Sequence, residues 1–472
     1  MQGFQQSVDI QSLISPLDWV VFAFTIALTA ASVLYGNSLK KKTTNEKDNF
    51  LDLLLMGRKL TLPLFVSTLV ATWYGGIFGV TEIAFNNGIY NFITQGAFWY
   101  VAYLIFAFFI IHKIKSYQAV TLPDLIGKMF GPNSAKLSAL FNLFNVLPIA
   151  YTISLGLFLQ TLFGGELLFN MSIGLIFVVL YSMWGGLRSV VFSDIIQFFV
   201  MCLGVFLVFS TSISTFGGLD FLKANLPTTH FEPLGGHGLA TTLVWGLIAL
   251  STLVDPNFYQ RCFAAESEKT AKKGIIISTG IWFLFDICTT FGAMYARAVL
   301  PEAESSTAYL TYAVQLLPDG LRGLFLAGIL ATILSTLDSY LFLAGTTITF
   351  DLLPIKWREK VSIHHLGVLS TAFISLILAY HFDGNIKLVW KTLGSYSAAC
   401  LLLPVLFGYL FPGKISDKQF LFSSILGIVF TTYWRNAPLP GFYAQIDELY
   451  AGIVATSMGL IICRTLANFR SN

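Results

Sequence analysis

The sequence is divided into thirteen apolar segments, each about as long as a helix needs to cross a lipid bilayer. A helix spans the hydrocarbon core with about 20 consecutive apolar residues. Only 11% of the residues are charged, whereas ordinary soluble domains carry about 25%. The pattern excludes a soluble globular protein and predicts an all-α polytopic membrane protein. The predicted spans are residues 17–36, 61–80, 93–112, 137–162, 168–186, 190–215, 239–258, 274–300, 321–350, 364–382, 386–411, 419–434 and 447–466.

The distribution of basic residues predicts the orientation of the chain. Lys and Arg favour cytoplasmic loops. When alternate loops are compared, most of the 28 Lys and Arg residues fall on one side, beginning with Lys40, Lys41 and Lys42 after the first span. A miscounted span would scramble this asymmetry. We therefore predict a multi-pass protein of the plasma (inner) membrane, with its N-terminus outside and its C-terminus in the cytoplasm.

The net charge of +3 reflects this topology, so the sequence implies no nucleic-acid partner. Residues 1–16 contain no Lys or Arg, which favours a membrane anchor over a cleaved signal peptide, because signal peptides begin with a basic region. The five cysteines show neither a zinc spacing nor a disulfide framework. The expected partners are the lipid bilayer and a small-molecule solute, and nothing in the sequence requires an oligomer.

Two predicted spans contain helix-breaking residues at their centres. The second span carries Gly75, Gly76 and Gly79, and each glycine lowers helix stability by about 1 kcal/mol. In the seventh span Pro256, which follows Asp255, removes a backbone donor. For either break alone, helix packing is an alternative explanation, because Gly and Pro are common in membrane helices. Interrupted helices at matching places in two halves, however, are typical of inverted-repeat transporters.

The spacing of the two breaks predicts the domain organisation. Because the breaks are five spans apart, we expect a five-plus-five inverted repeat with a discontinuous first helix in each repeat. Residues 51–216 would form the first five-helix repeat and residues 217–412 the second. Residues 1–50 would supply an extracytoplasmic segment, the first helix and a basic loop, and residues 413–472 two final helices and a short cytoplasmic tail.

Three motifs resemble the sodium:solute symporter family, which includes sodium-coupled glucose, proline, pantothenate, choline and sialic acid carriers. The motifs are YSMWGGLRSVVFSDIIQFF (181–199), DPNFYQRCFAAES (255–267) and ILSTLDSYLFLAGTTITFDL (333–352). They occur in the family's order, and the match runs from about Leu51 through the eleventh span. The resemblance implies a sodium-coupled secondary active symporter that imports a small organic solute by alternating access.

The resemblance also implies a sodium site between the broken second span and the ninth span. In the family, backbone carbonyls and two hydroxyls hold the ion. Carried onto this sequence, the carbonyls are those of Ala71, Tyr74 and Thr332, and the hydroxyls are those of Ser335 and Thr336. Uncharged oxygens at a helix break suit a hard monovalent cation. The alternative is that both hydroxyls simply bond back to carbonyls one turn earlier.

Some family members have a second sodium site, which here would comprise Asp194, Ser335, Asp338 and Ser339. The last three stand at i, i+3 and i+4 and so share one helix face. Asp338 departs from the family pattern, in which this position is small or hydroxyl-bearing. Its carboxylate would strengthen a cation site or hold a proton, which makes a proton-coupled symporter the alternative. A third possibility is structural: Asp338 caps a helix or pairs with a cytoplasmic Arg.

The embedded charges favour a cationic group on the solute. The spans contain five carboxylates, whereas Lys391 is the one base that we expect deep within a span. Aromatic faces beside a carboxylate can hold an ammonium group, so we expect an amine-bearing or zwitterionic solute, although each aromatic has an ordinary packing alternative. The carboxylates are Glu82, Asp194, Asp255, Asp286 and Asp338. The resemblance places the solute against Trp73, Gly76, Asn142, Asn145, Asp255, Asn257 and Trp390.

Two other functional classes fit the sequence less well. A membrane sensor with this fold would need an appended output domain, and the sequence ends soon after the last predicted span. A membrane enzyme would need a constellation of His, Cys or Ser at bilayer depth, whereas all six His lie at or beyond the span ends. The sequence therefore predicts a transporter and not an enzyme, with sodium as the co-transported ion and no organic cofactor.

Overall fold

The computed structural model describes residues 4–5, 9–39, 46–183, 186–358 and 360–471, and every named element in these ranges is helical. Within them, nine helices are long and apolar enough to cross a membrane by length and composition. They are Pro16–Ser38, Phe92–Ile114, Pro132–Phe163, Gly186–Phe216, Leu239–Ala264, Glu268–Val299, Leu321–Leu352, Val361–His381 and Ile386–Leu410. Three shorter apolar helices are Leu62–Ala71, Leu167–Ser182 and Glu448–Ile462.

Each predicted span overlaps one of these helices or α23 (Asp417–Asn436). The chain is thus a multi-pass helical protein, while the number of thirteen crossings stays a prediction. The other helices used below are α3 (Glu46–Leu55), α4 (Leu62–Ala71), α5 (Ile77–Asn87), α6 (Phe98–Ile105), α8 (Leu122–Met129), α9 (Pro132–Asn145), α10 (Ile149–Phe163), α11 (Leu167–Ser182), α14 (Leu239–Leu250), α15 (Pro256–Ala264), α16 (Glu268–Val299), α19 (Ile355–Arg358), α21 (Ile386–Ser397) and α24 (Glu448–Ser471).

The remaining elements are short. The α-helices are α1 (Ile10–Leu13), α7 (Ile111–Ser116), α13 (Leu219–Asn225), α17 (Ala308–Leu316) and α22 (Leu403–Leu410). Four π-helical segments lie at Phe92–Ala97, Phe106–Ile110, Thr347–Leu352 and Ala398–Leu402. Four 3₁₀ segments lie at Met56–Arg58, Thr228–Phe231, Ser251–Val254 and Gly441–Gln445.

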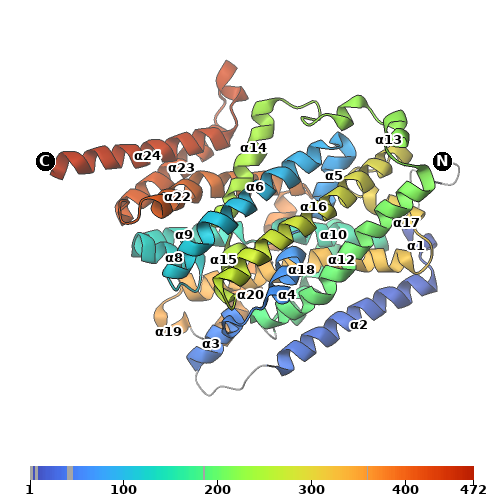
Figure 1. Ribbon diagram of the computed structural model, residues 1–472, viewed down its shortest axis with the longest axis horizontal. Helices are drawn as coiled ribbons and strands as arrows, with labels where there is room; N and C mark the ends of the chain where they lie inside the picture. The colour runs from blue at the N-terminus through green and yellow to red at the C-terminus, as the bar shows by residue number, and fades with distance from the viewer. Residues whose placement is uncertain (1–3, 6–8, 40–45, 184–185, 359, 472) are drawn as a thin grey trace.

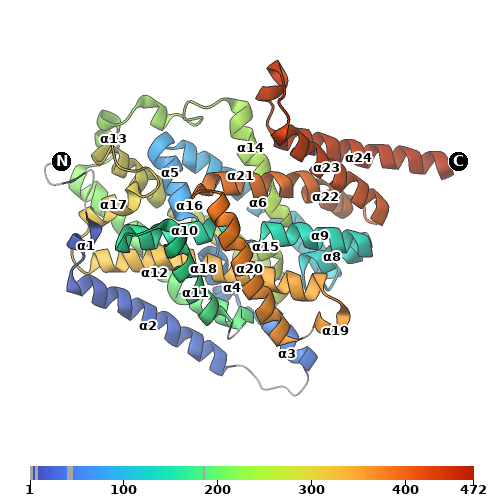
Figure 2. The same cartoon turned by 180° about the vertical axis from the view of Figure 1, so that it is seen from behind.

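The helix α18 (Leu321–Thr346) forms the centre of the molecule (Figure 1). It packs against α12 (Gly186–Phe216), α2 (Pro16–Ser38), α20 (Val361–His381) and α10. Seen from behind, α2 runs along one outer side of this bundle, and α23 and α24 extend together toward the C-terminus (Figure 2). The span that contains α18 is the most buried of the candidate spans in the described chain. Polar side chains on α18 are therefore shielded from lipid.

The first long helix is fastened to the beginning of α18. Asp18 is fully buried and accepts hydrogen bonds from the backbone amides of Gly320 (2.7 Å) and Gly323 (2.8 Å). Arg322 adds an ion pair to the same carboxylate at 3.2 Å. A Cβ on Gly323 would lie 2.2 Å from the backbone oxygen of Asp18, so only glycine permits this approach. The negative charge also suits the positive end of the helix dipole.

Both predicted helix interruptions are present. The first lies between α4 and α5, at residues 72–76, and the second lies between α14 and α15, where residues 251–254 form a 3₁₀ turn. Asp255 caps α15, and its Oδ1 accepts hydrogen bonds from the amides of Asn257 (2.8 Å) and Phe258 (3.4 Å). Pro256 follows at the first helical position, where the missing donor has no helical partner in any case.

Lys391, the base that the sequence places within a span, is paired with carboxylates of the C-terminal segment. Its side chain is 38% exposed and forms ion pairs with Asp447 (2.7 Å) and Glu448 (3.8 Å). Arg435 joins the same cluster through Glu448 at 3.5 Å. The reason is that the segment before α24 folds back over α21 and brings its own carboxylates. This cluster therefore fastens the C-terminal helix pair to α21.

Candidate functional site

Four of the five predicted ligands of the first sodium site lie together where α4 ends against α18. Ser335 donates a hydrogen bond to the carbonyl of Ala71 at 2.7 Å, and its hydroxyl lies 3.2 Å from the carbonyl of Thr332. Thr336 donates to the carbonyl of Thr332 at 3.0 Å. All four residues are buried. Because α4 ends at Ala71, its carbonyl is available to α18, and uncharged carbonyl and hydroxyl oxygens meet at one point.

The fifth residue, Tyr74, lies in the break, but its side chain points away from this point. Its phenol donates a hydrogen bond to Asp286 on α16. The next residue, Gly75, lies against α18, since a Cβ there would be 2.5 Å from the Cβ of Thr336. A side chain at position 75 would push the break away from the hydroxyls. The glycine is thus needed for the close approach of the two helices.

The predicted second site contains two buried carboxylates that are only partly hydrogen-bonded. Asp194 Oδ2 accepts from the hydroxyl of Thr68 at 2.5 Å, and Asp338 Oδ2 accepts from the phenol of Tyr181 at 3.3 Å. Neither Asp194 Oδ1 nor Asp338 Oδ1 has a hydrogen-bond partner among the described residues. A buried, unsatisfied carboxylate oxygen is costly. These two oxygens are therefore candidates to hold a cation or a proton.

A buried arginine lies inside this second site, although the alternation of loops predicts it in a cytoplasmic loop after the seventh span. Arg261 is fully buried, and its Nη2 donates to Thr72 (2.8 Å) and to Ser339 (2.9 Å). Its Nη1 donates to Asn257 at 2.8 Å. The charges of Asp194 and Asp338 act on this guanidinium. The sequence feature that could indicate a buried position for Arg261 is its place in QRCF, directly after the broken seventh span.

A cavity of about 130 Å³ lies beside the first break. Its lining includes five of the seven residues predicted to contact the solute, namely Trp73, Gly76, Asn145, Asp255 and Trp390. The other two lie elsewhere in the structure. Asn142 donates to Thr347 at 2.8 Å, and Asn257 accepts from Arg261. Lining residues that the sequence analysis missed are Gln95, Trp99, Tyr151, Trp245 and Tyr340.

The cavity is aromatic and carries one formal charge. Of the described residues that line it, only Asp255 is charged. Its Oδ1 caps α15, which leaves Oδ2 for a ligand. The ring centroids of Tyr151 and Tyr340 are 4.8 Å apart, and Trp73 and Trp390 also line the cavity. Aromatic faces around a carboxylate suit an organic cation.

A model of the sodium:solute symporter family matches residues 54–427 of the chain. Similar curated proteins include a sodium/glucose cotransporter of Vibrio parahaemolyticus, which is 23% identical and covers 91% of this chain and 87% of its own length. A sodium/pantothenate symporter of Escherichia coli (strain K12) is 24% identical over 73% of this chain and 75% of its own. A high-affinity proline transporter of Bacillus subtilis (strain 168) is 22% identical over 92% and 95%.

Solved structures with the same fold include the substrate-bound outward-open state of a Na⁺-coupled sialic acid symporter. Its TM-score is 0.75, with 17% identity over 96% of this chain and 98% of that one. A nucleobase-cation-symport-1 family transporter in a closed conformation gives a TM-score of 0.54, with 13% identity over 87% and 93%. All of these relatives and structural neighbours are transporters and not enzymes.

Proposed function

Because the chain belongs to the sodium:solute symporter family, we propose that it imports a small organic solute by sodium-coupled symport with alternating access. The contact that best supports this function is the one between Ser335 and the carbonyl of Ala71. It places a hydroxyl of α18 and a free carbonyl of a broken helix at one point beside a cavity. An ion bound there would hold α4 to α18 while the solute occupies the cavity.

The first sodium site in this proposal consists of the carbonyls of Ala71, Tyr74 and Thr332 and the hydroxyls of Ser335 and Thr336. The contacts among Ala71, Thr332, Ser335 and Thr336 support this site. Tyr74 lies in the break that follows α4. Sodium is a hard cation and prefers oxygen ligands, which an unwound helix supplies without a formal charge. No organic cofactor has a role in this cycle.

The second site in this proposal consists of Asp194, Ser335, Asp338 and Ser339, and it holds a monovalent cation. The two unpartnered carboxylate oxygens support it. Arg261 supplies one positive charge against Asp194 and Asp338, and Asp255 also acts on it, so a bound cation would reduce the excess negative charge of the group. A proton on Asp338 is the alternative, and it would make this carboxylate the site of proton coupling. Sodium binding measured with and without Asp338→Asn distinguishes the two cations.

The solute in this proposal carries an amine and is cationic or zwitterionic. Five predicted residues support it by lining one cavity: Trp73, Gly76, Asn145, Asp255 and Trp390. Asn142 and Asn257 would act from outside this cavity, because they bond to Thr347 and Arg261. A buried cation–π contact contributes about 2 kcal/mol. Several such faces around one carboxylate would therefore select an ammonium group over a neutral solute of equal size.

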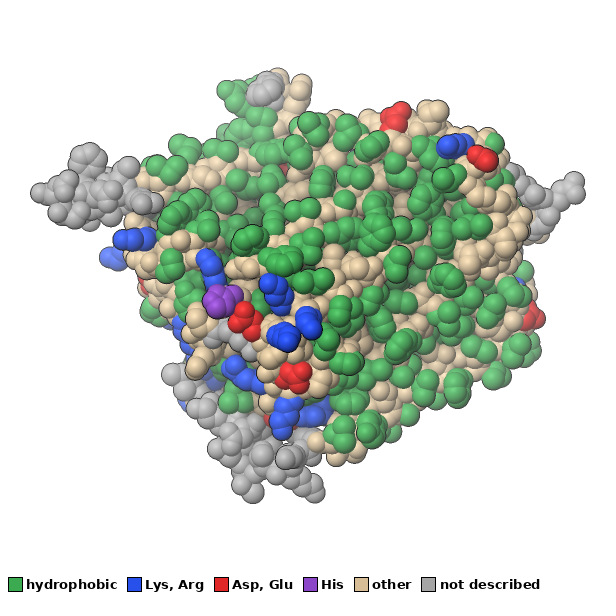
Figure 3. All heavy atoms as spheres, in the orientation of Figure 1, with side chains coloured by type: hydrophobic (Ala, Val, Ile, Leu, Met, Phe, Trp, Pro, Cys, Tyr) green, Lys and Arg blue, Asp and Glu red, His purple; other side chains and the backbone are tan. Residues whose placement is uncertain are grey.

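The proposed topology has thirteen membrane helices, with the N-terminus outside and the C-terminus in the cytoplasm. Residues 51–216 and 217–412 are the two inverted repeats, residues 1–50 precede them and residues 413–472 follow. The two interrupted helices support the repeats. Lys and Arg side chains gather toward the end of the molecule where α3, α8 and α19 lie, and a mostly hydrophobic surface covers the middle (Figure 3). This supports the orientation. The proposal requires no oligomer.

Transport and binding experiments test this function separately. In the first, proteoliposomes containing the purified protein are screened for uptake of amine-bearing and neutral solutes, with either sodium or potassium outside. Uptake that needs an inward sodium gradient is expected for an amine-bearing solute. In the second, thermal unfolding is followed in sodium, potassium and choline chloride, because a ligand that binds only the folded protein raises its stability. Equal stabilisation by all three salts would contradict the sodium site.

A further inference from the structure

A buried carboxylate that the proposed sites do not include lies directly behind the first break. Asp286 on α16 is 1% exposed. One of its oxygens accepts a hydrogen bond from the phenol of Tyr74, and the other accepts from the phenol of Tyr100 on α6. Burying a carboxylate is costly unless hydrogen bonds compensate. The two phenols provide that compensation, and one of them belongs to the break.

Backbone hydrogen bonds do little to position the break. Those of α4 end with the amide of Trp73, which lies 3.4 Å from the carbonyl of Val70, and those of α5 begin at the carbonyl of Gly76. In between, the amides of Tyr74 and Gly75 form no backbone hydrogen bond with any residue that the structure describes. Side-chain contacts must therefore set where this segment lies.

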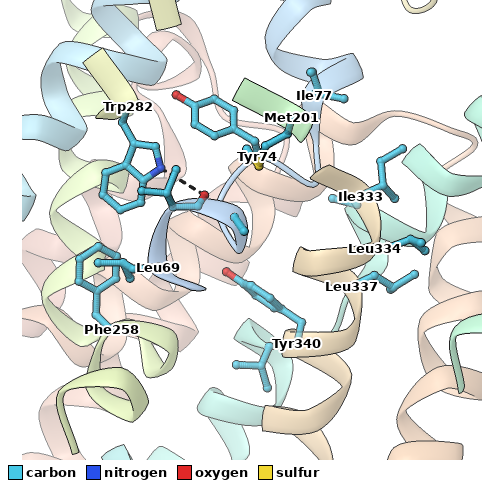
Figure 4. Packing of buried hydrophobic residues seen from close by; sticks show 14 of the residues in the cluster. Leu69, Tyr74, Ile77, Met201, Phe258, Trp282, Ile333, Leu334, Leu337 and Tyr340 are labelled. Carbon is cyan, nitrogen blue, oxygen red and sulfur yellow. Dashed lines mark hydrogen bonds between the residues drawn. The ribbon is translucent and has the colours of Figure 1, made fainter. Parts of the chain in front are cut away.

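One face of α16 provides these contacts on one side of the break. Trp282, Phe285 and Asp286 stand at i, i+3 and i+4, so they share a face. Trp282 Nε1 donates to the carbonyl of Val70 at 3.4 Å, and the rings of Phe285 and Tyr74 are 4.2 Å apart. Figure 4 shows Trp282 on one side of the broken helix and Leu334 and Leu337 of α18 on the other. The break is thus held between α16 and α18.

The contact on the other side leads directly to the sodium hydroxyls. Gly75 follows Tyr74 in the chain, and a Cβ on Gly75 would lie 2.5 Å from the Cβ of Thr336 and 2.7 Å from its hydroxyl oxygen. Two consecutive residues therefore connect the carboxylate of Asp286 to a proposed sodium ligand. If the bond between Tyr74 and Asp286 is lost, the break can move relative to Ser335 and Thr336.

We propose that Asp286 is a positioning residue for sodium binding, which acts by holding Tyr74 and so fixing the carbonyls of the break against the hydroxyls of α18. This inference rests on the sodium site in the proposed function. Tyr100 provides an internal control, because it bonds to the same carboxylate from α6 and has no backbone atoms in the break. A merely structural role for Asp286 would depend equally on both phenols, whereas a positioning role depends on Tyr74.

The test measures sodium binding without solute. Wild type, Tyr74→Phe, Asp286→Asn, Tyr100→Phe and the double variant Tyr74→Phe/Asp286→Asn are purified. The sodium concentration that gives half of the full thermal stabilisation is measured at constant ionic strength, with potassium as the balancing ion. Loss of a hydrogen bond to a charged group is expected to raise this concentration about tenfold in Tyr74→Phe and in Asp286→Asn. The double variant should match the larger single effect, and Tyr100→Phe should stay within about twofold of wild type.

Three results would overturn the inference. Equal increases for Tyr74→Phe and Tyr100→Phe would mean that Asp286 only stabilises the fold. In the second result, sodium stabilises wild type selectively, but the sodium concentration for half of the full stabilisation is unchanged in Tyr74→Phe and Asp286→Asn. This result would refute the positioning role and leave the proposed function intact. Equal stabilisation of wild type by sodium and potassium would refute both. If Asp286→Asn does not fold, Tyr74→Phe carries the comparison, because it keeps the ring contact with Phe285.

Discussion

Ser335 in the middle of α18 donates a hydrogen bond of 2.7 Å to the carbonyl of Ala71, the last residue of α4. This bond joins the most buried candidate span of the described chain to a broken helix. An ion bound to both the hydroxyl oxygen and the carbonyl oxygen, in place of this hydrogen bond, would keep the same two helices together.

Replacing Ser335 or Thr336 with Ala should weaken sodium dependence more than it weakens the fold. Each change removes one of the proposed oxygen ligands, so we expect the sodium concentration for half-maximal uptake to rise about tenfold, as for the loss of one hydrogen bond to a charged group. Uptake at varied sodium concentration measures this effect. Thr349→Ala is the matched control, because its hydroxyl also bonds back within the same span. Wild-type sodium affinity in both variants would place the ion elsewhere.

Arg261→Gln should be strongly destabilising, and Asp338→Asn should partly rescue it. Removing the guanidinium leaves two buried carboxylates without their positive neighbour, which we expect to cost about 3 kcal/mol or more of unfolding free energy. Neutralising Asp338 then removes part of the repulsion. Thermal unfolding of both single variants and the double variant gives the coupling energy, expected at about 1–3 kcal/mol. Strictly additive effects would mean that the two charges do not interact.

Gly76→Ala should be destabilising unless Trp390 is made smaller. A Cβ at position 76 would lie 1.9 Å from an atom of the Trp390 ring, so the ring must move. Overpacking of this kind costs about 1–3 kcal/mol. The double variant Gly76→Ala/Trp390→Leu should recover most of the lost stability relative to Trp390→Leu alone. Gly280→Ala on α16 is the control, because nothing lies near the added Cβ there.

Asp417 should stabilise the protein in a way that is lost in acid. Partial burial alone would raise its pKa, but hydrogen bonds from Ser134 and Asn133 outweigh it and hold the pKa of Asp417 below its usual value. The folded state therefore favours the carboxylate. Its contribution is fully present above about pH 4, the unfolded pKa, and disappears as the pH falls through the folded pKa.

Asp417→Ala should accordingly lower the free energy of unfolding at pH 7 by about 1 kcal/mol, as for the loss of a helix cap. The difference from wild type should shrink as the pH falls below about 4. Thermal melts across pH measure it, and Lys418→Ala serves as the neighbouring surface control. A deficit that stays constant down to the lowest pH would mean that packing, not the charge, is responsible.

His230 should make the protein less stable at mildly acidic pH. Burial lowers the pKa of His230, and the nearby charge of Arg297 lowers it further. The hydrogen bond from His230 to the carbonyl of Phe85 at 3.0 Å raises the pKa but does not outweigh these two effects. The unfolded state therefore binds more protons, so stability falls as the pH drops below about 6.5. His230→Gln should flatten the change in melting temperature between pH 7.5 and 5. The exposed His381→Gln should leave the wild-type profile in place.

Hydropathy predicts where the helices lie, because each helix that crosses lipid must be one continuous apolar segment of the sequence. Glycine and proline predicted both interruptions, since each acts on the backbone of its own residue. The meeting of Ser335 with Ala71 depends on contacts between distant segments, and it was expected only through the resemblance of ILSTLDSY to a family. Local sequence alone would equally have allowed hydroxyls that bond back within α18.

The remaining site residues depend on contacts between segments that are distant in the sequence. Arg261 looked like a residue of a basic loop, because loop charge and a charge buried one turn inside a helix look the same in a sequence. The cavity residues Trp99 and Trp245 lie in mostly apolar spans, so no periodicity reveals which face is inward. Asp286 stood out as an embedded carboxylate, but its phenol partners are far from it in sequence.

The bonds from Asp18 to the amides of Gly320 and Gly323 join the first helix mechanically to the beginning of α18. About 22 Å of helix separates Gly320 from Ser335 at 1.5 Å per residue. The helix α2 and the beginning of α18 are therefore joined as one unit, and the hydroxyls of Ser335 and Thr336 lie partway along α18. If the bundle rocks during transport, these hydroxyls would move with α2, and the break at residues 72–76 would be displaced relative to them.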